Sequence, residues 1–563
     1  MAKKDYSKLN KEELLEVIKN LESKKKYGLV WDEEKVPEKV VVDCQHQLPV
    51  LKEVKDKEII TDPNQPTHIL IEGDNYHALS VLNYTHKGKI DLIYIDPPYN
   101  TGNKDFFYND CYVEKEDTWR HSKWLNFMSK RLELAKELLT EKGVIFISID
   151  DNEVAQLKLL CDKVFGEINF AGQWQWFKSA TPPNLSNKIK KNLEFILVYE
   201  KQKNNSKFRG IKKISKSDDP ITKIQNSVKV LTFPPNTINI KLLNSSIKAG
   251  IYGTEKYPNK LLNDLLIENG KNKNQVSFEN RFVWTQRKLD EELLNNTIIN
   301  CSKTLVISYK KQNYSEEVPP NLIDETVGVD TTEEAGKRLF EMFNEKVFDY
   351  PKPVSLIKYL LNFKNELKNE NTIILDFFAG TGTTAQAVLE LNEEDGGNRK
   401  FIVCTNNENQ ICEKATLPRI FKIINGYKNL KEEQIEGLGN NLKYFKTSFV
   451  KNRPNKDQLK IEITKQCTEM LCLKEGIFNL KTATKDYKIF EQNNCYMAVF
   501  YDFANASLDE LKKQMNALKG EKILYCFTLL EKLETINFKG WKDIRLEPIP
   551  QKILDLYLEI FKN

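Results

Sequence analysis

The sequence predicts an α/β fold: a doubly wound parallel sheet, interrupted by a long insertion and followed by a small α/β domain. Three observations lead to this prediction. Strand-like and helix-like patterns alternate between residues 67 and 202, which favours a parallel sheet covered by helices. A buried strand, a glycine-rich turn and a helix follow one another after residue 372, as in one half of a doubly wound sheet. The stretch 203–347 is rich in Lys, Asn, Ser and Thr and lacks this alternation.

Composition places the chain among ordinary globular proteins. Its length leaves room for about three to four domains. Charged residues make up 29% of the chain, hydrophobic residues 40%, and the formal net charge is +5. The ten cysteines include no CxxC pair, so we expect no metal site and no disulfide framework. No apolar run reaches about 18 residues, and no apolar leader is evident; we therefore expect a protein of the reducing cytoplasm that does not enter a membrane.

We expect five segments along the chain. Apolar residues at helical spacing in 7–25 predict an amphipathic helix, and the proline-containing stretch 28–66 predicts an extended lead-in. The last segment carries no chemical constellation, and we expect it to serve dimerisation or docking of a partner. The segments are an N-terminal arm and lead-in at 1–66, a first α/β half at 67–202, the insertion at 203–347, a second α/β half at 348–438 and a C-terminal α/β domain at 439–563.

Asp74 is the first candidate site residue along the chain. The apolar strand 69–71 precedes it, and a helix through Leu79 and Leu82 follows it. Acidic side chains at the carboxyl ends of parallel strands often face a ligand, but an aspartate at this position also caps a helix. The two interpretations are equally supported.

The stretch DLIYIDPPYNTGNKDFFY, residues 91–108, is the centre of the predicted site. A buried strand ends at Asp96, and Pro97, Pro98 and Tyr99 follow. The two prolines remove two backbone donors, so the carbonyl groups of this tetrapeptide face an open crevice. Tyr99 adds an aromatic face beside these acceptors. Such a combination suits a planar base that carries an exocyclic amino group.

The acidic cluster Asp150, Asp151 and Glu153 follows the next predicted strand, 144–149. It lacks the spacing of metal ligands and precedes a helical pattern, so capping and solvation explain it better than metal binding. A further strand, FILVYEK at 195–201, closes the first half. His121 is a tempting base, but a structural or DNA-contacting role is the better interpretation.

The insertion contains basic runs interleaved with aromatic residues, for example Lys207, Arg209, Lys212 and Lys213. Each run taken singly is explained equally well as a solvated surface. An irregular lysine-rich module next to a candidate base-binding pocket is stronger evidence, and it is where we expect recognition of a nucleic acid sequence.

The second half holds the candidate cofactor site. A buried strand ends at Asp376, and a turn with two glycines then leads into a helix; the turn lacks the GK[ST] ending of a phosphate-binding loop. The residues of this turn are Asp376, Phe378, Ala379, Gly380, Thr381, Gly382 and Thr383. After the next strand, either Asn406 or Glu408 is placed to hold ribose hydroxyl groups. The sequence does not separate these two.

DPPY, a long insertion and then FxGxG, in this order, resemble the β-class of DNA amino-methyltransferases. More narrowly, EGDNYHALSVLNYTHKGKIDLIYIDPPYNTGNKDF, HSKWLNFMSKRLELAKELL, FDYPKPVSLI and DFFAGTGTT resemble modification (Mod) subunits of type III restriction-modification systems. The resemblance covers most of residues 27–430. It departs at TNNE after the second strand, where the family has a simpler acidic ending.

The resemblance implies a circularly permuted, Rossmann-like sheet of the S-adenosylmethionine-dependent methyltransferases, with a target-recognition domain in the insertion. S-adenosylmethionine would lie over the glycine-rich turn, with Asp74 near its adenine amino group and Lys352 and Pro353 near its methionine portion. A target adenine, flipped out of the duplex, would stack on Tyr99. Its N6 amino group would donate to Asp96 and to the carbonyl of Pro97, beside Pro98.

The implied function is site-specific methylation of adenine N6, which protects DNA from a cognate restriction enzyme. The implied partners are double-stranded DNA, a second copy of the chain in a homodimer, and an ATP-dependent restriction (Res) subunit. Alternatives are an orphan or type II adenine methyltransferase, a cytosine-N4 methyltransferase, for which these families more often carry Ser in place of Asp96, and a non-catalytic DNA-recognition subunit. Decay to the last of these should have damaged Asp96, Tyr99, Gly380 or Gly382, and all four are present.

Overall fold

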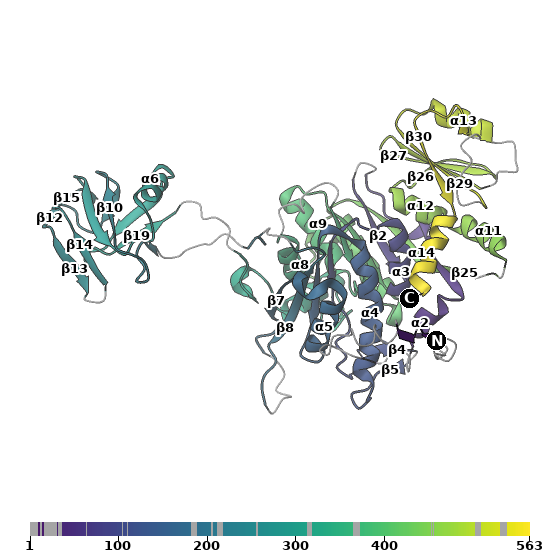
Figure 1. Cartoon of the computed structure of the whole chain (residues 1–563), viewed down its shortest axis with the longest axis horizontal. Coiled ribbons are helices and arrows are strands. Elements are labelled where there is room, and N and C mark those ends of the chain that lie inside the picture. Colours follow the sequence, from purple (N-terminus) through teal and green to yellow (C-terminus); the bar gives the residue numbers. More distant parts are fainter. Residues whose placement is uncertain are drawn as a thin grey trace. The chain divides into compact units, whose positions relative to one another are not determined.

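The chain forms two compact units in a computed structural model, one made of residues 1–207 and 320–563 and the other of residues 208–319 (Figure 1). The helix predicted at 7–25 lies largely outside the residues that the structure describes. The described residues are 10–11, 14–15, 31, 37–62, 65–103, 105–109, 111–181, 188–203, 207–210, 218–254, 257–311, 318–363, 372–451, 453, 455–501, 508–529 and 538–562.

A ten-stranded sheet forms the centre of the larger unit. Its strands lie in the order β1-β25-β2-β22-β21-β3-β6-β8-β7-β20. The six from β25 to β6 run parallel, whereas β8 is antiparallel to both of its neighbours. In this order their bounds are Gln47–Glu53, Asn441–Lys451, Thr67–Glu72, Lys400–Thr405, Ile373–Asp376, Ile90–Ile95, Leu139–Ile149, Leu193–Glu200, Phe170–Phe177 and Leu322–Ile323.

The strand order places the switch point of the sheet between β21 and β3. From β21 the sheet continues through β22 to β2, and from β3 it continues through β6 in the opposite direction. The two strands are paired in parallel, with Ile374 opposite Leu92 and Leu375 opposite Ile93. This confirms the doubly wound fold, and it places the strand that ends at DPPY next to the strand that ends at the glycine-rich turn. In such sheets ligands bind outside the carboxyl ends of the strands at this point.

Helices cover both faces of the sheet. Ile93 and Ile95 of β3 share one hydrophobic cluster with buried residues of α3, α4 and α5. On β6, Phe146 instead contacts Phe363, two residues after the end of α8, with ring centroids 5.7 Å apart. Burial on both faces explains the continuous apolar runs of the parallel strands. The helices are α3 (Asn75–Thr85), α4 (Arg120–Leu138), α5 (Val154–Cys161), α8 (Val354–Leu361), α9 (Thr383–Asp395) and α10 (Leu417–Asn425).

The predicted extended lead-in is partly regular. Residues Lys39–Asp43 form helix α2, and β1 pairs antiparallel with β25. Pro49 lies within β1, which is tolerated because β1 is an edge strand. Because its prolines were interpreted as breaks in regular structure, this stretch was not predicted to contain a strand of the central sheet.

The C-terminal domain packs onto the central sheet rather than standing apart. It has a five-stranded sheet in the order β26-β27-β28-β29-β30. Helices α12 and α14 contact α3, and the hydroxyl of Tyr557 donates to the backbone oxygen of Pro49 at 2.5 Å. Because β25 belongs to the central sheet, this domain begins after Lys451 rather than at 439. Its elements are α11 (Lys456–Gln466), α12 (Thr468–Glu475), β26 (Asn479–Ala483), β27 (Tyr487–Gln492), β28 (Cys495–Phe500), α13 (Leu508–Ala517), β29 (Glu521–Phe527), β30 (Ile544–Ile549) and α14 (Gln551–Lys562).

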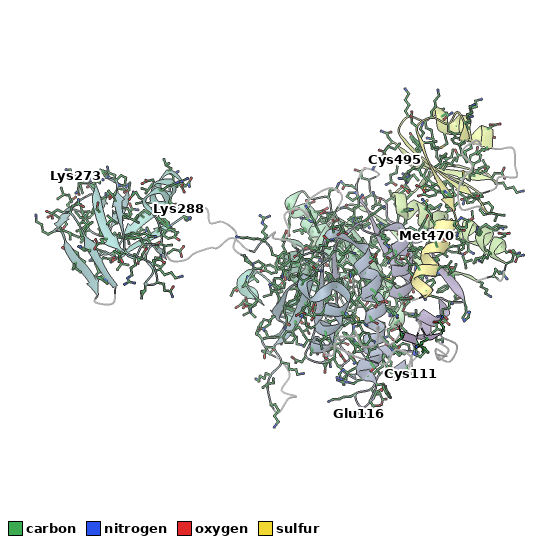
Figure 2. All side chains as sticks on the ribbon, viewed as in Figure 1. Cys111, Glu116, Lys273, Lys288, Met470 and Cys495 are labelled. Atoms are coloured by element: carbon green, nitrogen blue, oxygen red, sulfur yellow. The ribbon has the colours of Figure 1, made fainter. Side chains whose placement is uncertain are left out.

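The insertion unit has a hydrophobic core of its own and two sheets, ordered β10-β17-β14-β13 and β12-β15-β16-β11-β18-β19-β9. It is shorter than the predicted 203–347, because β20 and α7 (Thr332–Phe343) belong to the larger unit. Lys273 and Lys288 lie on its surface (Figure 2). Its elements are β9 (Asp219–Pro220), β10 (Lys229–Phe233), β11 (Ile238–Ile240), β12 (Ser245–Ile247), β13 (Gly250–Thr254), β14 (Tyr257–Leu261), β15 (Leu265–Glu268), β16 (Lys271–Asn272), β17 (Val276–Asn280), α6 (Gln286–Leu294), β18 (Ile298–Cys301) and β19 (Ile307–Lys310).

Two short hairpins complete the larger unit, β4 (Phe107–Tyr108) with β5 (Cys111–Tyr112) and β23 (Gly426–Lys428) with β24 (Gln434–Glu436). All ten cysteines are free thiols. Among the described residues, no cluster of three or more potential metal ligands occurs. No described helix combines the length and the apolar character needed to cross a membrane.

Candidate active site

Asp96 lies just beyond the end of β3 in a compact group of charged side chains. Its Oδ2 is 2.9 Å from Nζ of Lys352, and its Oδ1 is 2.8 Å from the hydroxyl of Tyr99. Glu194, on β8, lies on the other side of the same ammonium group, with Oε2 3.1 Å from Lys352 Nζ and 3.0 Å from the Tyr99 hydroxyl. Lys178 pairs with the second oxygen of Glu194 at 3.0 Å. The carboxylates of Asp96 and Glu194 therefore share the ammonium group of Lys352 beside the DPPY motif.

The two carboxylates of this group have opposite pKa shifts. Burial holds the pKa of Asp96 above its usual range; Lys352 opposes the shift and Glu194 adds to it. Burial also acts on Glu194, but Lys352 and Lys178 outweigh it and hold the pKa of Glu194 below its usual range. Burial therefore dominates the pKa of Asp96, whereas the two lysines dominate the pKa of Glu194.

The loop that carries DPPY is held by hydrogen bonds on both sides of Tyr99. The indole of Trp124 donates to the backbone oxygen of Pro98 at 2.7 Å. Asn100 has a left-handed backbone with φ of 57°. Its amide donates to Glu153 Oε1 at 2.5 Å and to the backbone oxygen of Arg120 at 3.3 Å. Helix α4 and the residue before α5 thus fix the position of the loop.

His121 contacts Glu153 rather than serving as an isolated base. Arg120 donates to Nε2 of His121, so its Nδ1 carries the proton and donates to Glu153 Oε1 at 2.6 Å. Burial and the neighbouring Arg120 hold the pKa of His121 below its usual range. A neutral imidazole in this bonding pattern supports the structural interpretation of His121.

The acidic cluster at 150–153 is only partly as expected. Asp150 accepts a hydrogen bond from the backbone N–H of Asn152 at 2.8 Å, and Asp151 forms an exposed ion pair with Lys191. Glu153 differs, because its side chain is 0% exposed. Solvation is therefore the wrong explanation for this residue. Burial raises the pKa of Glu153 to about 8.

The raised pKa of Glu153 predicts a pH-dependent loss of stability. The unfolded chain releases this proton near pH 4.5 and the folded chain near pH 8, so the folded state binds the extra proton in between. Stability contributed by the group is therefore complete below pH 4.5 and is lost as the pH rises toward 8. We expect Glu153→Gln to remove this loss and to gain on the order of 3 kcal/mol over the wild type at pH 8.5. Urea unfolding at pH 5.5 and 8.5 measures it; an equal pH dependence in both proteins would refute the assignment.

The glycine-rich turn begins at Asp376, the last residue of β21. Its carboxylate accepts hydrogen bonds from the Phe378 N–H at 2.9 Å and from the Thr384 hydroxyl at 2.5 Å. Burial raises the pKa of Asp376 to about 7. The Ala379 N–H donates to the backbone oxygen of Cys404 on β22 at 3.0 Å. These contacts fix the turn against the end of the sheet.

Thr416, at the start of α10, and Arg419, in its first turn, hold the glycine-rich turn by hydrogen bonds. Thr416 donates to the backbone oxygen of Gly380 at 2.6 Å, and Arg419 donates to the hydroxyls of Thr381 and Thr383, both at 2.9 Å. Gly382 has φ of +82°, and a Cβ there would lie 3.3 Å from Thr416. Both the backbone conformation and the packing favour glycine at 382.

The opposite side of the turn is open. Gly380 has φ of +50°, and a Cβ placed there meets only the backbone oxygen of Phe378, at 3.9 Å. Gly380 and Phe378 are partly exposed, whereas Ala379 and Thr381 are buried. A ligand can therefore approach the backbone closely at Gly380, as it does at glycine-rich turns of doubly wound sheets.

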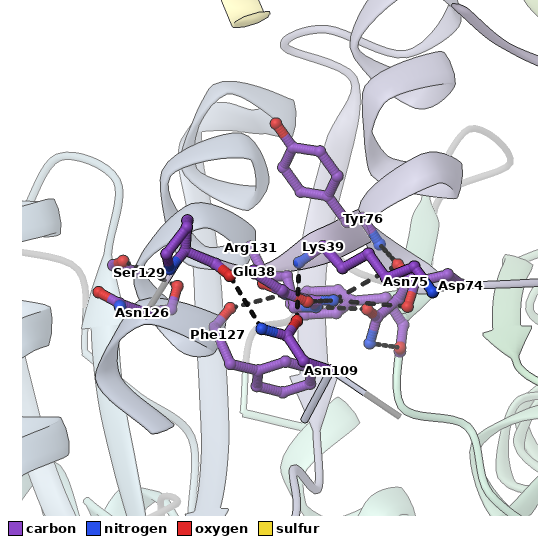
Figure 3. A network of polar contacts seen from close by, with 12 residues as sticks. Glu38, Lys39, Asp74, Asn75, Tyr76, Asn109, Asn126, Phe127, Ser129 and Arg131 are labelled. Atoms are coloured by element: carbon purple, nitrogen blue, oxygen red, sulfur yellow. Dashed lines mark hydrogen bonds and ion pairs between the residues drawn. The ribbon is translucent and has the colours of Figure 1, made fainter. Parts of the chain in front are cut away.

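Asp74 caps helix α3 and also joins a buried ionic network (Figure 3). The fully buried Arg131 forms a two-point ion pair with Glu38 at 2.8 and 2.9 Å and lies 3.4 Å from Asp74. Asn75 accepts from Arg131 at 2.5 Å and donates to the backbone oxygen of Phe377 at 3.0 Å. The network thus links the segment before α2, helix α3 and the glycine-rich turn. Because the side chain of Asp74 is 32% exposed, capping leaves part of it open to a ligand.

Asn406 and Glu408 are both exposed beyond the end of β22, and the Glu408 N–H donates to Asn406 Oδ1 at 3.4 Å. The structure leaves the choice between them open. Pro353 is buried and precedes α8, while Lys352 faces Asp96. The predicted cofactor residues therefore lie in three groups: the turn from Asp376 to Thr383, the segments that follow β2 and β22, and the segment before α8.

Several residues of this region carried weak signals in the sequence. Glu194 is a carboxylate inside the apolar strand LEFILVYE, and Arg131 lies three residues after Met128 on the apolar stripe of α4. A charged residue in a buried position is expected to be paired. Their apolar sequence surroundings could have marked Glu194 and Arg131 as paired buried charges, but could not have identified the residues that pair with them.

An acceptor group beside an open glycine-rich turn, at the switch point of a doubly wound sheet, is typical of a site that binds a nucleotide-type ligand. A family model described as DNA methylase (N6_N4_Mtase) matches residues 90–417, which is more than half of the chain. The chain belongs to this family of DNA methylases.

Three curated relatives are similar over much of the chain. The Mod subunit of the type III restriction-modification enzyme StyLTI of Salmonella typhimurium is 32% identical over 384 residues, 62% of this chain and 55% of that protein. The EcoPI Mod subunit of Escherichia phage P1 is 31% identical over 445 residues, 70% of this chain and 66% of the relative. The type II methyltransferase M.KpnI of Klebsiella pneumoniae is 30% identical over 359 residues, 60% of this chain and 79% of the relative. The chain therefore spans less than two thirds of the two Mod subunits.

Proposed function

We propose that this chain is the modification subunit of a type III restriction-modification system. It transfers a methyl group from S-adenosylmethionine to the N6 amino group of an adenine in double-stranded DNA. The observation that carries the proposal is the position of Asp96 and the glycine-rich turn on neighbouring strands at the switch point, in a chain of the DNA methylase family. The similarity to two Mod subunits supports the narrower assignment.

The residues around the glycine-rich turn fit S-adenosylmethionine. The open backbone at Gly380 admits a ligand, and the partly exposed Asp74 supplies an acceptor for its adenine amino group. Asn406 or Glu408 holds the ribose, and Lys352 with Pro353 lies toward the methionine portion. The bound molecule supplies an electrophilic methyl group on a sulfonium centre. Every other task of the reaction falls to the chain and to the DNA.

Asp96 and the Pro97 carbonyl position the nucleophile. An aryl amine is a poor nucleophile because its lone pair is delocalised into the ring. Two acceptors that hold its N–H groups direct the lone pair toward the methyl group, and positioning of this kind supplies several kcal/mol of the barrier. The target base leaves the duplex and stacks on Tyr99, at a cost of about a few kcal/mol for unstacking. Asp96 accepts most strongly when it is ionised.

The insertion unit recognises the DNA sequence, and the C-terminal domain joins a second copy of the chain or an ATP-dependent Res subunit. A folded module with its own core and surface lysines such as Lys273 suits contact with phosphates. The protein acts on the chromosome in the cytoplasm.

Transfer of tritium from S-adenosyl-[methyl-³H]methionine to unmodified genomic DNA tests the proposal. We expect label in DNA, and we expect DNA premethylated by the same chain with unlabelled cofactor to accept almost none. Transfer that does not saturate, or no transfer by a chain that binds both ligands, would contradict the proposed function.

A further inference from the structure

Glu194 stands out among the buried charged residues because it touches the DPPY group without belonging to it. Its side chain is 9% exposed, and both of its oxygens are engaged, one by Lys178 at 3.0 Å and the other by Lys352 at 3.1 Å. The charges of Asp96, Glu194, Lys352 and Lys178 sum to zero. A balanced set of partly buried charges holds its geometry because each loss leaves an unpaired partner.

Lys352 has one acceptor for each of its three N–H groups. These are Asp96 Oδ2 at 2.9 Å, Glu194 Oε2 at 3.1 Å and the Tyr99 hydroxyl at 2.9 Å. When a base offers its amino group to Asp96, Lys352 keeps the other two. Glu194 therefore provides an anchor for the ammonium group that does not depend on Asp96.

We propose that Glu194 is a positioning residue for the methyl transfer, which anchors Lys352 between two carboxylates so that Lys352 and Asp96 keep their places when Asp96 accepts the target amino group. This inference rests on the proposed function and deepens it. Glu194 acts through Lys352 and Tyr99, and it touches neither substrate nor cofactor.

The pKa directions agree with this division of roles. Lys178 and Lys352 hold the pKa of Glu194 low despite burial, whereas burial holds that of Asp96 high. We expect the acid limb of the reaction to report Asp96, because its protonated form is a weaker acceptor than the carboxylate. The charged and titratable groups that face this pair are Tyr99 in the same loop, Tyr94 on β3, Lys352 before α8, Lys178 after β7, Asp150 after β6 and Asp376 at the end of β21.

Single-turnover rates of methyl transfer, measured from pH 5 to 9, test the inference with two variants of opposite expected sign. Glu194→Gln removes a negative neighbour from Asp96, so its acid limb should move down by about one pH unit; the plateau rate should fall about tenfold. Lys352→Gln removes the positive neighbour, so its acid limb should move up by about one unit or more. An acid limb that came from Asp376 would not shift in opposite directions in the two variants, because Asp376 contacts neither Glu194 nor Lys352.

Glu53→Gln is the matched control. Lys443 on β25 also lies between two carboxylates, 2.7 Å from Glu53 at the end of β1 and paired with Glu58, but outside the site. Its pH profile should coincide with that of the wild type.

Opposite shifts of the two acid limbs, together with the lower plateau rate of Glu194→Gln, support the inference, and an unchanged plateau rate would overturn it. A Glu194→Gln protein that transfers methyl with an unmoved acid limb would overturn it, because a purely structural residue lowers the rate equally at every pH. If Glu194→Gln does not fold, Lys352→Gln decides alone, and an unmoved acid limb in that variant would overturn the inference too.

Absence of transfer by the wild type would overturn the proposed function and this inference together. Transfer with the same acid limb in the wild type and both variants would overturn this inference but leave the proposed function intact.

Discussion

Replacing Asp96 with alanine is expected to lower the rate of methyl transfer by about a thousandfold. The variant loses the acceptor that orients the amino group, while Tyr99, Glu194 and Lys352 keep their mutual contacts. Binding of DNA should change by less than about threefold, since the contacts with phosphate made elsewhere supply most of that affinity. Single-turnover transfer and a gel-shift titration measure the two quantities.

Asp151→Ala is the control for this prediction. Asp151 is 44% exposed, and its ion pair is with Lys191 at the surface, so its loss should leave transfer within about twofold of the wild type. An Asp96→Ala protein that methylated DNA at the wild-type rate would show that this carboxylate does not position the base.

Replacing Arg131 with methionine should cost about 3 to 5 kcal/mol of stability. The guanidinium group is fully buried and pairs with Glu38, Asp74 and Asn75. Without it, Glu38 is left as a buried carboxylate lacking its cation; burial already holds the pKa of Glu38 above its usual range. Urea unfolding followed by far-UV circular dichroism measures the loss.

Two comparisons sharpen the test of Arg131. Lys87→Met removes an exposed pair with Glu137 between α3 and α4 and should leave stability unchanged. Glu38→Leu combined with Arg131→Met should recover part of the loss, because the double variant removes both members of the buried pair. A single Arg131→Met variant as stable as the wild type would contradict the role assigned to this network.

The order of strands and the place of the site were predictable because apolar runs mark where buried strands end. Asp96 and Asp376 each follow such a run, and the rule that ligands bind at the switch point joins them across 280 residues of sequence. The direction of β8 was not predictable in this way. An apolar run does not indicate whether its strand is parallel or antiparallel to its neighbours. Only the pairing of β8 with β6 shows that β8 is antiparallel.

The residues that pair with the buried charged side chains could not be predicted from the sequence. Glu194 contacts Tyr99 and Lys352, which lie 95 residues before it and 158 residues after it in the sequence. No local pattern encodes such contacts. Glu153 shows the same limit, because an acidic residue before a helix can be an exposed cap or, as here, a buried group that holds a loop.

Sequencing of modified bases in genomic DNA from cells that express this chain alone tests the central claim most directly. The proposed function predicts N6-methyladenine at one short sequence throughout the genome, and its absence in cells that express the Asp96→Ala variant. N4-methylcytosine at the site, or DNA without any modification, would contradict it.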